Sequence, residues 1–127
     1  MGRTAISAPE APQPMGPYSP AVRDKGSGLL FVSGQTPIDP RTGELVDGDV
    51  GTQTQRVFAN LQHVLGAAGC SMADVIKVNV YLITMADFAA VNEVYATVFD
   101  APYPARTTVA VAELPVGARV EIELVAR

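Results

Sequence analysis

The sequence predicts an α+β fold, in which two helices cover one face of a mixed β-sheet in the element order ββαβαββ. Apolar residues recur at helical spacing in residues 50–68 and again in residues 85–99. Apolar and polar residues alternate in residues 75–83 and 120–124, as is typical of strands with one core face. These two periodicities together define the predicted helix layer and sheet.

Length and charge limit the classes of protein that fit. The chain has 127 residues, enough for one domain that buries about two thirds of its unfolded surface, so we expect residues 1–127 to form a single domain. A net charge of -4 and a pI near 4.8 provide no basic face for phosphate backbones, which disfavours nucleic acid and anionic membranes as partners. The mean hydropathy of +0.21, with 17% charged residues, predicts that apolar surface is buried between subunits.

Cysteine and histidine are too scarce for several kinds of site. The single cysteine, Cys70, excludes an intrachain disulfide, and the single histidine, His63, excludes the usual zinc sites of His and Cys. The first residues lack the apolar core of a signal peptide, and no apolar run approaches the roughly 18 residues of a membrane span. A cytoplasmic protein without metal or membrane contact is therefore expected.

The N-terminal part of the chain is predicted to be extended. Residues 1–15 are rich in Ala and Pro and form an arm, and two prolines stiffen residues 16–22. Tyr18 is held on this rigid segment, where it either makes a packing contact or directs its phenol toward a ligand.

The apolar strand at residues 29–35 ends in a Ser-Gly pair, Ser33 and Gly34. A glycine at a strand end indicates either a bulge or a close backbone approach. In the second case, a small hydroxyl and a bare N–H would lie beside a bound ligand. Residues 36–46 contain the turn chemistry of a surface loop.

The first helix is predicted to begin after Asp49 or Thr52 and to stop at Gly69. Its buried face is expected to carry Val57, Phe58, Leu61, Val64, Leu65 and Ala68. Its solvent face is expected to carry Gln53, Arg56, Asn60 and Gln62.

In the strand at residues 75–83, one set of alternating side chains is expected to face the core: Ile76, Val78, Val80 and Leu82. The second helix follows, with Thr84 as its cap, and Asn92 interrupts its apolar stripe. A buried amide needs hydrogen-bond partners, because leaving it unpaired costs on the order of 1–3 kcal/mol. Asn92 therefore either bridges two backbone segments or holds a subunit edge or a site loop.

The last fifth of the chain brings together an arginine and a glutamate. Arg106 precedes the strand predicted at residues 107–111, and a hairpin-like return could place Glu121 alongside it. In the last strand, Glu121 lies on the face opposite Val120 and Ile122. The pair is either a plain structural salt bridge or part of a site. The sheet face away from the helices is predicted to carry Lys77, Asn79, Tyr81, Arg119 and Glu121, and burying this mixed face between subunits would create clefts there.

The sequence resembles the RidA-type enamine/imine deaminases of the YjgF/Rid family over essentially the whole chain. The resemblance is carried by APQPMGPYSPAV, LFVSGQTPIDPRTGEL, ADFAAVNEVYATVF and PARTTVAVAELPVGARVEIE. It implies a Rid-type domain with a chorismate-mutase-like fold, a homotrimer with sites between chains, and no cofactor. The implied reaction is hydrolysis of reactive 2-enamino or 2-imino acids, such as 2-aminoacrylate, to 2-keto acids and ammonia.

The family motifs imply a set of site residues in this sequence. Arg106 would bind the substrate carboxylate, and Glu121 would activate the attacking water. Tyr18, Ser33, Gly34 and Asn92 would line the pocket. Thr108 stands where many bacterial members have Cys and would contribute its backbone carbonyl, which leaves the preferred substrate open.

The implied chemistry suits these residue types, because a planar guanidinium binds a carboxylate in a bidentate way that Lys cannot. An imine carbon is already electrophilic, so oriented water and a proton-carrying carboxylate suffice for hydrolysis. Two alternatives stay open: a protein that binds 2-keto acids or acts like a chaperone without turnover, and an endoribonuclease or translation inhibitor. The acidic pI disfavours the second of these.

Overall fold

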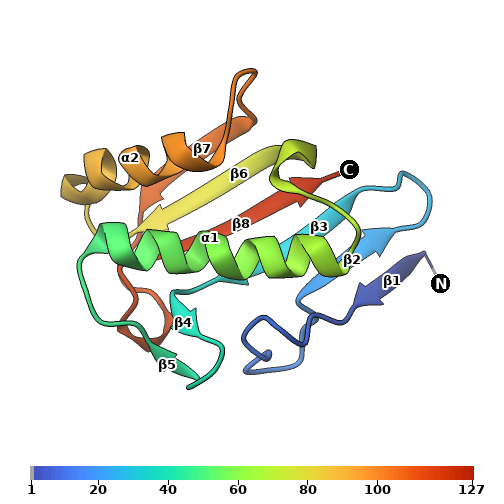
Figure 1. Ribbon diagram of the computed structural model, residues 1–127, viewed down its shortest axis with the longest axis horizontal. Coiled ribbons are helices and arrows are strands. Elements are labelled where there is room, and N and C mark those ends of the chain that lie inside the picture. Colours follow the sequence, from blue (N-terminus) through green and yellow to red (C-terminus); the bar gives the residue numbers. More distant parts are fainter. Residues whose placement is uncertain (1) are drawn as a thin grey trace.

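A six-stranded mixed sheet with two helices on one face forms the framework of the computed structural model, which describes residues 2–127 (Figure 1). The helices are α1 (Val50–Ala67) and α2 (Phe88–Val98). The sheet strands are β1 (Arg3–Ile6), β2 (Ala21–Asp24), β3 (Leu30–Gln35), β6 (Val75–Leu82), β7 (Ala105–Ala110) and β8 (Val120–Ala126). A separate short hairpin consists of β4 (Ile38–Asp39) and β5 (Glu44–Leu45). The predicted α+β architecture is therefore confirmed, but the predicted element order ββαβαββ is incomplete, because five strands and not two precede α1.

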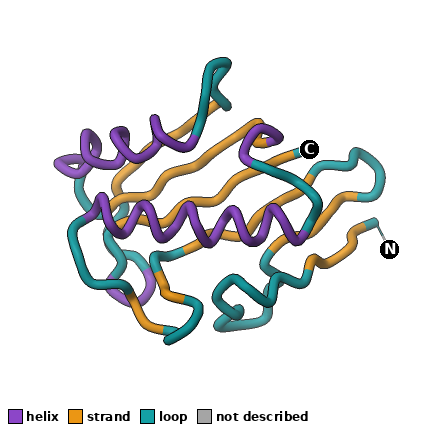
Figure 2. The backbone as a smooth tube through the Cα atoms, in the orientation of Figure 1, coloured by secondary structure: helices purple, strands orange, loops and turns teal. Residues whose placement is uncertain are grey.

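The strand order across the sheet is β1-β2-β3-β8-β6-β7. Neighbouring strands are antiparallel except β6 and β7, which are parallel and are joined through α2. Both helices lie in one layer over the strands (Figure 2). Within residues 2–127 no helix combines the length and the apolar sequence that a membrane span requires.

The core lies between α1, α2 and the inner face of the sheet, as the two periodicities predict. Alternate residues of β8 are fully buried, among them Val120 and Ile122. They pack with the apolar stripe of α1, including Val57 and Leu61. Edge-on contacts of Phe58 with Tyr95 and Phe99 connect the two helices, with ring centroids 5.9 and 5.8 Å apart.

Local signals at the helix ends also agree with the structure. Asp49 is the N-cap of α1 and accepts a hydrogen bond from the Thr52 backbone N–H at 2.9 Å, which gives the longer of the two predicted helices. Gly69 has φ +77° directly after the end of α1. Thr84 caps a short 3-10 turn, Met85–Asp87, from which α2 continues.

Two predicted solvent-facing residues of α1 are buried instead. Asn60 is fully buried, and its Nδ2 donates to the carbonyl oxygens of Thr36 and Ile38 at 3.2 and 2.9 Å. Gln53 is 4% exposed, and its Oε1 accepts from the backbone N–H of Arg119 at 3.0 Å. Their amides satisfy backbone groups of segments that pack against α1, so a polar residue type did not indicate a solvated face here.

The strands also differ from the sequence predictions. The register of β6 against β8 shifts between Val75 and Lys77, so Ile76 is an extra bulged residue that is 49% exposed, and Val75 takes the expected core position. Arg119 does not share the outer face with Glu121, because its Nη2 donates to Asp87 Oδ1, next to α2, at 2.9 Å. The arm at residues 1–15 contributes β1 to the sheet edge.

The contribution of the buried Asn60 amide to stability can be tested by mutation. We expect Asn60→Ala to lower the free energy of unfolding by about 1–3 kcal/mol for each carbonyl that loses its donor. Urea unfolding followed by circular dichroism measures the change. Gln62→Ala, at an exposed position of the same helix, is the control and should shift the midpoint little. Equal midpoints for the two variants would show that the loop carbonyls do not depend on Asn60.

Candidate functional site

Apart from Thr108, the predicted site residues line two separate hollows, on opposite faces of the sheet. The first, which we call the Glu121 hollow, has a volume of about 380 Å³. Its lining residues come from the N-terminal loop, the end of β3, the segment before β8 and β8 itself: Met15, Tyr18, Ser33, Gly34, Thr36, Pro115, Glu121 and Glu123. Three of the predicted residues, Tyr18, Ser33 and Gly34, thus surround the predicted Glu121.

Gly34 leaves room for the Glu121 side chain in this hollow. A Cβ atom at Gly34 would overlap the Glu121 carboxylate, and the backbone there does not have a positive φ. The glycine is therefore required by the side chain that lies against it and not by its own backbone conformation. Since Gly34 lies in β3, next to β8, the bare Cα fixes the space in which the Glu121 carboxylate lies.

Ser33 lines this hollow and also anchors the segment before β2. Its Oγ donates to the carbonyl oxygen of Ser19 at 2.7 Å, and its backbone N–H donates to the carbonyl of Pro20 at 2.9 Å. These bonds hold the proline-rich segment against β3. Tyr18, on that segment, is 48% exposed, and its hydroxyl accepts from the Met15 backbone N–H at 3.2 Å.

The electrostatics of Glu121 differ from those of an exposed glutamate. Burial raises the pKa of the Glu121 carboxyl above its usual 4.5, and the negative charge of Glu123 raises it further. None of the ion pairs formed by residues 2–127 includes Glu121. A carboxyl group that binds its proton more firmly than usual is suited to exchange protons with a reactant.

The second hollow, which we call the Arg106 hollow, has a volume of about 310 Å³. It lies where α2 passes the edge strand β7 and the loop before it, and is lined by Asn92, Tyr95, Ala96, Tyr103, Pro104 and Arg106. Two of the predicted residues, Arg106 and Asn92, are thus brought together.

The Arg106 guanidinium is held by α2. Its Nη1 donates to Asn92 Oδ1 at 2.8 Å, and its central carbon lies 4.7 Å from the Tyr95 ring centroid and 5.5 Å from that of Phe88. An amide and two aromatic faces fix the plane of the group without neutralising its charge. Among the ion pairs of residues 2–127, none involves Arg106, so the guanidinium remains free to bind a carboxylate.

The prediction that Glu121 lies alongside Arg106 is wrong within one chain. The strand β6 lies between β7 and β8, with Arg106 opposite Val78 and Glu121 opposite Tyr81. Val78 faces the core, so Arg106 faces the helix side, whereas Tyr81 and Glu121 face the open side, away from the helices. The plain salt-bridge interpretation of this pair is therefore excluded within the chain.

Thr108 belongs to neither hollow. It faces the helix side, two residues beyond Arg106, and its Oγ1 is buried without a hydrogen-bond partner in the part of the chain that the structure describes. The structure therefore does not place its side chain where a ligand in the Arg106 hollow would touch it.

Several lining residues were not predicted as site residues. Tyr95 lies three residues after Asn92 on the same helical face, and Glu123 lies two residues after Glu121 on the same strand face. The spacing alone could have suggested both. Burial raises the pKa of the Tyr95 hydroxyl, against the opposing effect of Arg106.

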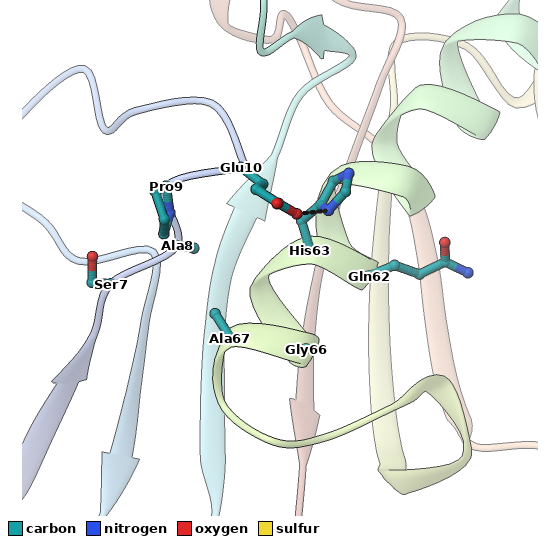
Figure 3. Close-up of a pocket in the computed structure, with 8 residues that line it drawn as sticks. All are labelled: Ser7, Ala8, Pro9, Glu10, Gln62, His63, Gly66 and Ala67. Atoms are coloured by element: carbon teal, nitrogen blue, oxygen red, sulfur yellow. Dashed lines mark ion pairs between the residues drawn. The ribbon is translucent and has the colours of Figure 1, made fainter.

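A third hollow, of about 500 Å³, lies between residues 7–10 and the C-terminal half of α1 (Figure 3). His63 Nδ1 and Glu10 Oε2 are 3.2 Å apart there, with both side chains substantially exposed. Ser7 lies at the far end of the hollow from His63 (Figure 3), so these residues do not form a nucleophile and base pair. None of the predicted site residues lines this hollow.

Comparison with known proteins identifies the family. The family model described as Endoribonuclease L-PSP matches residues 8–127. A RutC family protein of Pyrococcus horikoshii is 50% identical over 124 residues, covering 98% of this chain and 97% of the relative. The 2-iminobutanoate/2-iminopropanoate deaminase of Dermatophagoides farinae is 48% identical over 118 residues, covering 93% of this chain and 91% of that protein.

The fold comparison agrees with the sequence comparison. The crystal structure of RidA from the Antarctic bacterium Psychrobacter sp. PAMC 21119 matches with a TM-score of 0.91 and 42% identity, covering 97% of this chain and 98% of that one. The match extends over the sheet, both helices and the strands that carry Arg106 and Glu121. This chain therefore belongs to the YjgF/Rid family, to which the Endoribonuclease L-PSP model corresponds.

Proposed function

We propose that this protein hydrolyses reactive 2-enamino and 2-imino acids, such as 2-aminoacrylate, to 2-keto acids and ammonia. One observation carries the proposal: a guanidinium that forms no ion pair with residues 2–127 and a carboxyl with a raised pKa each lie in a hollow of their own, on opposite sides of the sheet. The name of the Dermatophagoides farinae relative, a 2-iminobutanoate/2-iminopropanoate deaminase, supports this reaction class.

Joining the two hollows requires a second copy of the chain. The open face of the sheet carries exposed apolar side chains next to its charged residues, with Phe31 46% exposed and Val109 41% exposed. Packing this face around a rotation axis buries the apolar groups. The Arg106 hollow, at the edge strand β7, would then meet the Glu121 hollow of a neighbouring copy. We propose a homotrimer, with one composite site at each interface.

In the composite site Arg106 binds the substrate carboxylate. The fork of the guanidinium matches the two carboxylate oxygens, and Asn92 and the rings of Tyr95 and Phe88 hold its plane. Binding at this end fixes the position of the imine carbon relative to Glu121. Tyr18, Ser33, Gly34 and Thr108 complete our proposed set, Tyr18 by covering the substrate and Thr108 through its backbone carbonyl.

Glu121 moves the protons of the reaction. An enamine substrate first takes a proton at carbon to give the protonated imine. Water then adds to the imine carbon, Glu121 accepts one proton from that water, and the electrons of the C=N bond move to nitrogen. Glu121 returns the proton to the amino nitrogen, and the C–N bond breaks with its electron pair on nitrogen. The departing ammonia takes up the hydroxyl proton as the C=O bond forms. The net reaction converts a protonated imine and water to a keto acid and ammonium.

The deciding assay couples the protein to a dehydratase that releases 2-aminoacrylate and to a lactate dehydrogenase that reports pyruvate. Pyruvate should appear faster than by spontaneous hydrolysis, in proportion to the protein added. Binding of pyruvate without any acceleration would instead support a non-catalytic 2-keto acid binding protein. RNA cleavage in place of both would support the endoribonuclease alternative, which the pI near 4.8 disfavours.

The homotrimer is testable separately. Light scattering after size exclusion should report close to three times the chain mass of 13.3 kDa at micromolar concentration. Phe31→Glu, which places a charge on the exposed apolar part of the open face, should lower that mass. A monomeric wild-type chain would overturn both the assembly and the composite site.

Gly34→Ala tests whether the free space beside Glu121 matters. The added methyl group meets the end of a flexible side chain, so the fold should survive while the Glu121 carboxylate is displaced. We expect the hydrolysis rate to fall at least about tenfold, with pyruvate binding largely kept. Gly66→Ala is the control, because a Cβ there meets no atom within 4 Å. Full activity of Gly34→Ala would show that the position of the carboxylate is not critical.

A further inference from the structure

The Glu121 hollow contains a second carboxylate that the proposed reaction does not use. Glu123 lies two residues along β8 from Glu121, on the same open side of the sheet, and lines the same hollow. The register places Asn79 of β6 opposite Glu123 and Tyr81 opposite Glu121. Two carboxylates therefore lie side by side on the open side of β8, next to β6.

Glu123 is held in place by donors from β6. The Tyr81 hydroxyl donates to Glu123 Oε1 across the diagonal of the ladder, and Asn79 Nδ2 donates to the same oxygen at 3.4 Å. The hydrogen bond to Glu123 raises the pKa of Tyr81 to about 12, so the phenol keeps its proton and remains a donor. In residues 2–127 no hydrogen-bond donor to the Glu121 side chain is found. Hydrogen bonds therefore fix the Glu123 carboxylate, whereas no donor from residues 2–127 fixes that of Glu121.

The charges around Glu121 come from few groups. Its own strand contributes Glu123, and β6 contributes the neutral phenol of Tyr81, while β3 and the N-terminal loop contribute only the uncharged Gly34, Ser33 and Tyr18. Two cations of β6 and of the segment before β8 are engaged elsewhere: Lys77 Nζ donates to Thr107 Oγ1 at 3.0 Å, and Arg119 pairs with Asp87 at 2.9 Å. Glu123 is therefore the charge that Glu121 experiences most directly.

We propose that Glu123 is a positioning residue that acts through Glu121: fixed by Tyr81 and Asn79, its charge increases the affinity of Glu121 for a proton. Like charges in a partly buried site disfavour a second ionised carboxylate, which is the physical basis of the effect. Its catalytic consequence depends on the proposed deaminase function. In the assembled site the substrate carboxylate compensates Arg106 of the second copy, so Glu123 remains the principal charge that acts on Glu121.

The consequence for the reaction follows from the proton transfers. Glu121 must take a proton from water and then return it to nitrogen. A carboxyl whose pKa lies closer to the working pH does both better than an ordinary glutamate. Glu123 supplies this property without contacting the substrate. Glu123→Gln keeps the side-chain length and an oxygen that accepts from Tyr81, and removes only the charge.

The experiment is a titration of the glutamate side chains by NMR, in the full chain labelled with ¹³C at the glutamate carboxyls. The resonance missing in Glu121→Gln identifies Glu121. Glu123→Gln should move the titration midpoint of Glu121 to lower pH. Glu44→Gln makes the same change in net charge at an exposed site outside both hollows, and should leave the midpoint in place. An unmoved midpoint in Glu123→Gln, or an equal movement in Glu44→Gln, overturns the proposal.

A second pair of variants keeps the test decisive if Glu123→Gln does not fold. Glu123→Asp and Glu123→Asn share one length and differ only in charge, so the Glu121 midpoint should be lower in the Asn variant than in the Asp variant. Equal midpoints contradict the proposal.

Kinetics provide a separate readout. The acidic limb of the profile of kcat/KM against pH should move to lower pH in Glu123→Gln. The kcat near neutral pH should fall about three- to tenfold, while the Kd for pyruvate changes less than about twofold. Wild-type protein that does not accelerate hydrolysis refutes the proposed function, yet the NMR titration still decides whether Glu123 acts on Glu121. An acidic limb that stays in place in an active Glu123→Gln enzyme refutes the inference alone.

Discussion

Glu121→Gln should reduce the rate of imine hydrolysis by about 10²- to 10⁴-fold, which is the usual contribution of a general acid–base group. Gln keeps the size of the side chain and one acceptor oxygen, but it cannot take up or return a proton. Binding of pyruvate should change little, because in our proposal Arg106 of another copy holds the carboxylate. Single-turnover rates and pyruvate Kd values, both measured on this variant, separate the two effects.

The matched control for Glu121→Gln is Glu44→Gln, which removes the same charge from an exposed position of β5. It should retain wild-type rate and binding. An undiminished hydrolysis rate in Glu121→Gln would remove this carboxyl from the mechanism. Loss of pyruvate binding together with the rate would instead make Glu121 a support for the carboxylate site.

Although Glu121→Gln should lower the hydrolysis rate, it should raise the stability of the fold near neutral pH. Burial and the Glu123 charge raise the pKa of Glu121 in the folded chain above its ordinary value of 4.5. The folded state therefore favours the protonated carboxyl, a contribution that is fully present below pH 4.5 and is lost as the pH rises through the folded pKa. Gln does not titrate, so Glu121→Gln should gain stability relative to wild type as the pH rises to neutrality.

Thermal unfolding at several pH values measures this gain. The Tm difference between Glu121→Gln and wild type should be larger at neutral pH than below pH 4.5. A difference that is independent of pH would show that Glu121 has the same proton affinity in the folded and unfolded chain. A gain in stability combined with a loss of rate is the pattern expected of a residue retained for activity.

Arg106→Lys should lower kcat/KM at least about tenfold and leave the fold intact. Lysine keeps the positive charge but loses the planar fork that binds both carboxylate oxygens, and it stacks less well on the rings of Tyr95 and Phe88. A charge-assisted hydrogen bond contributes roughly 1.5–3 kcal/mol, which corresponds to a factor of about ten or more. The kinetics, the Kd for pyruvate and the mass from light scattering should be measured on this variant.

Arg41→Lys is the control for Arg106→Lys, because Arg41 is exposed and lines neither hollow. Its kinetics should match those of the wild type. If Arg106→Lys instead dissociates or unfolds the protein, the guanidinium has a structural role in holding β7 against α2. An Arg106→Lys variant with normal kcat/KM would show that charge alone suffices at this position.

Most local elements could be predicted from the sequence, because the signals that define them lie within a few residues. The alternation of Val120, Ile122 and Leu124 indicates the buried face of β8, and these residues are buried as expected. The apolar stripe of α1 and its cap at Asp49 were likewise readable. Features that depend on partners far apart in the chain could not be predicted in this way. Asn60 is buried because it binds carbonyls 22 and 24 residues away, and Ile76 is displaced by a bulge in the pairing with β8.

The sequence by itself determined the helix layer, the core face of β8 and most of that of β6, and the residue types at the candidate site, because periodicity, caps and family motifs are carried by neighbouring residues. Only the tertiary structure decided where Arg106 and Glu121 lie relative to each other. Strand order is set by pairing between segments far apart in the chain, and here β6 pairs with both β7 and β8. That insertion, together with the alternation of side chains along each strand, puts the two residues on opposite faces of the sheet.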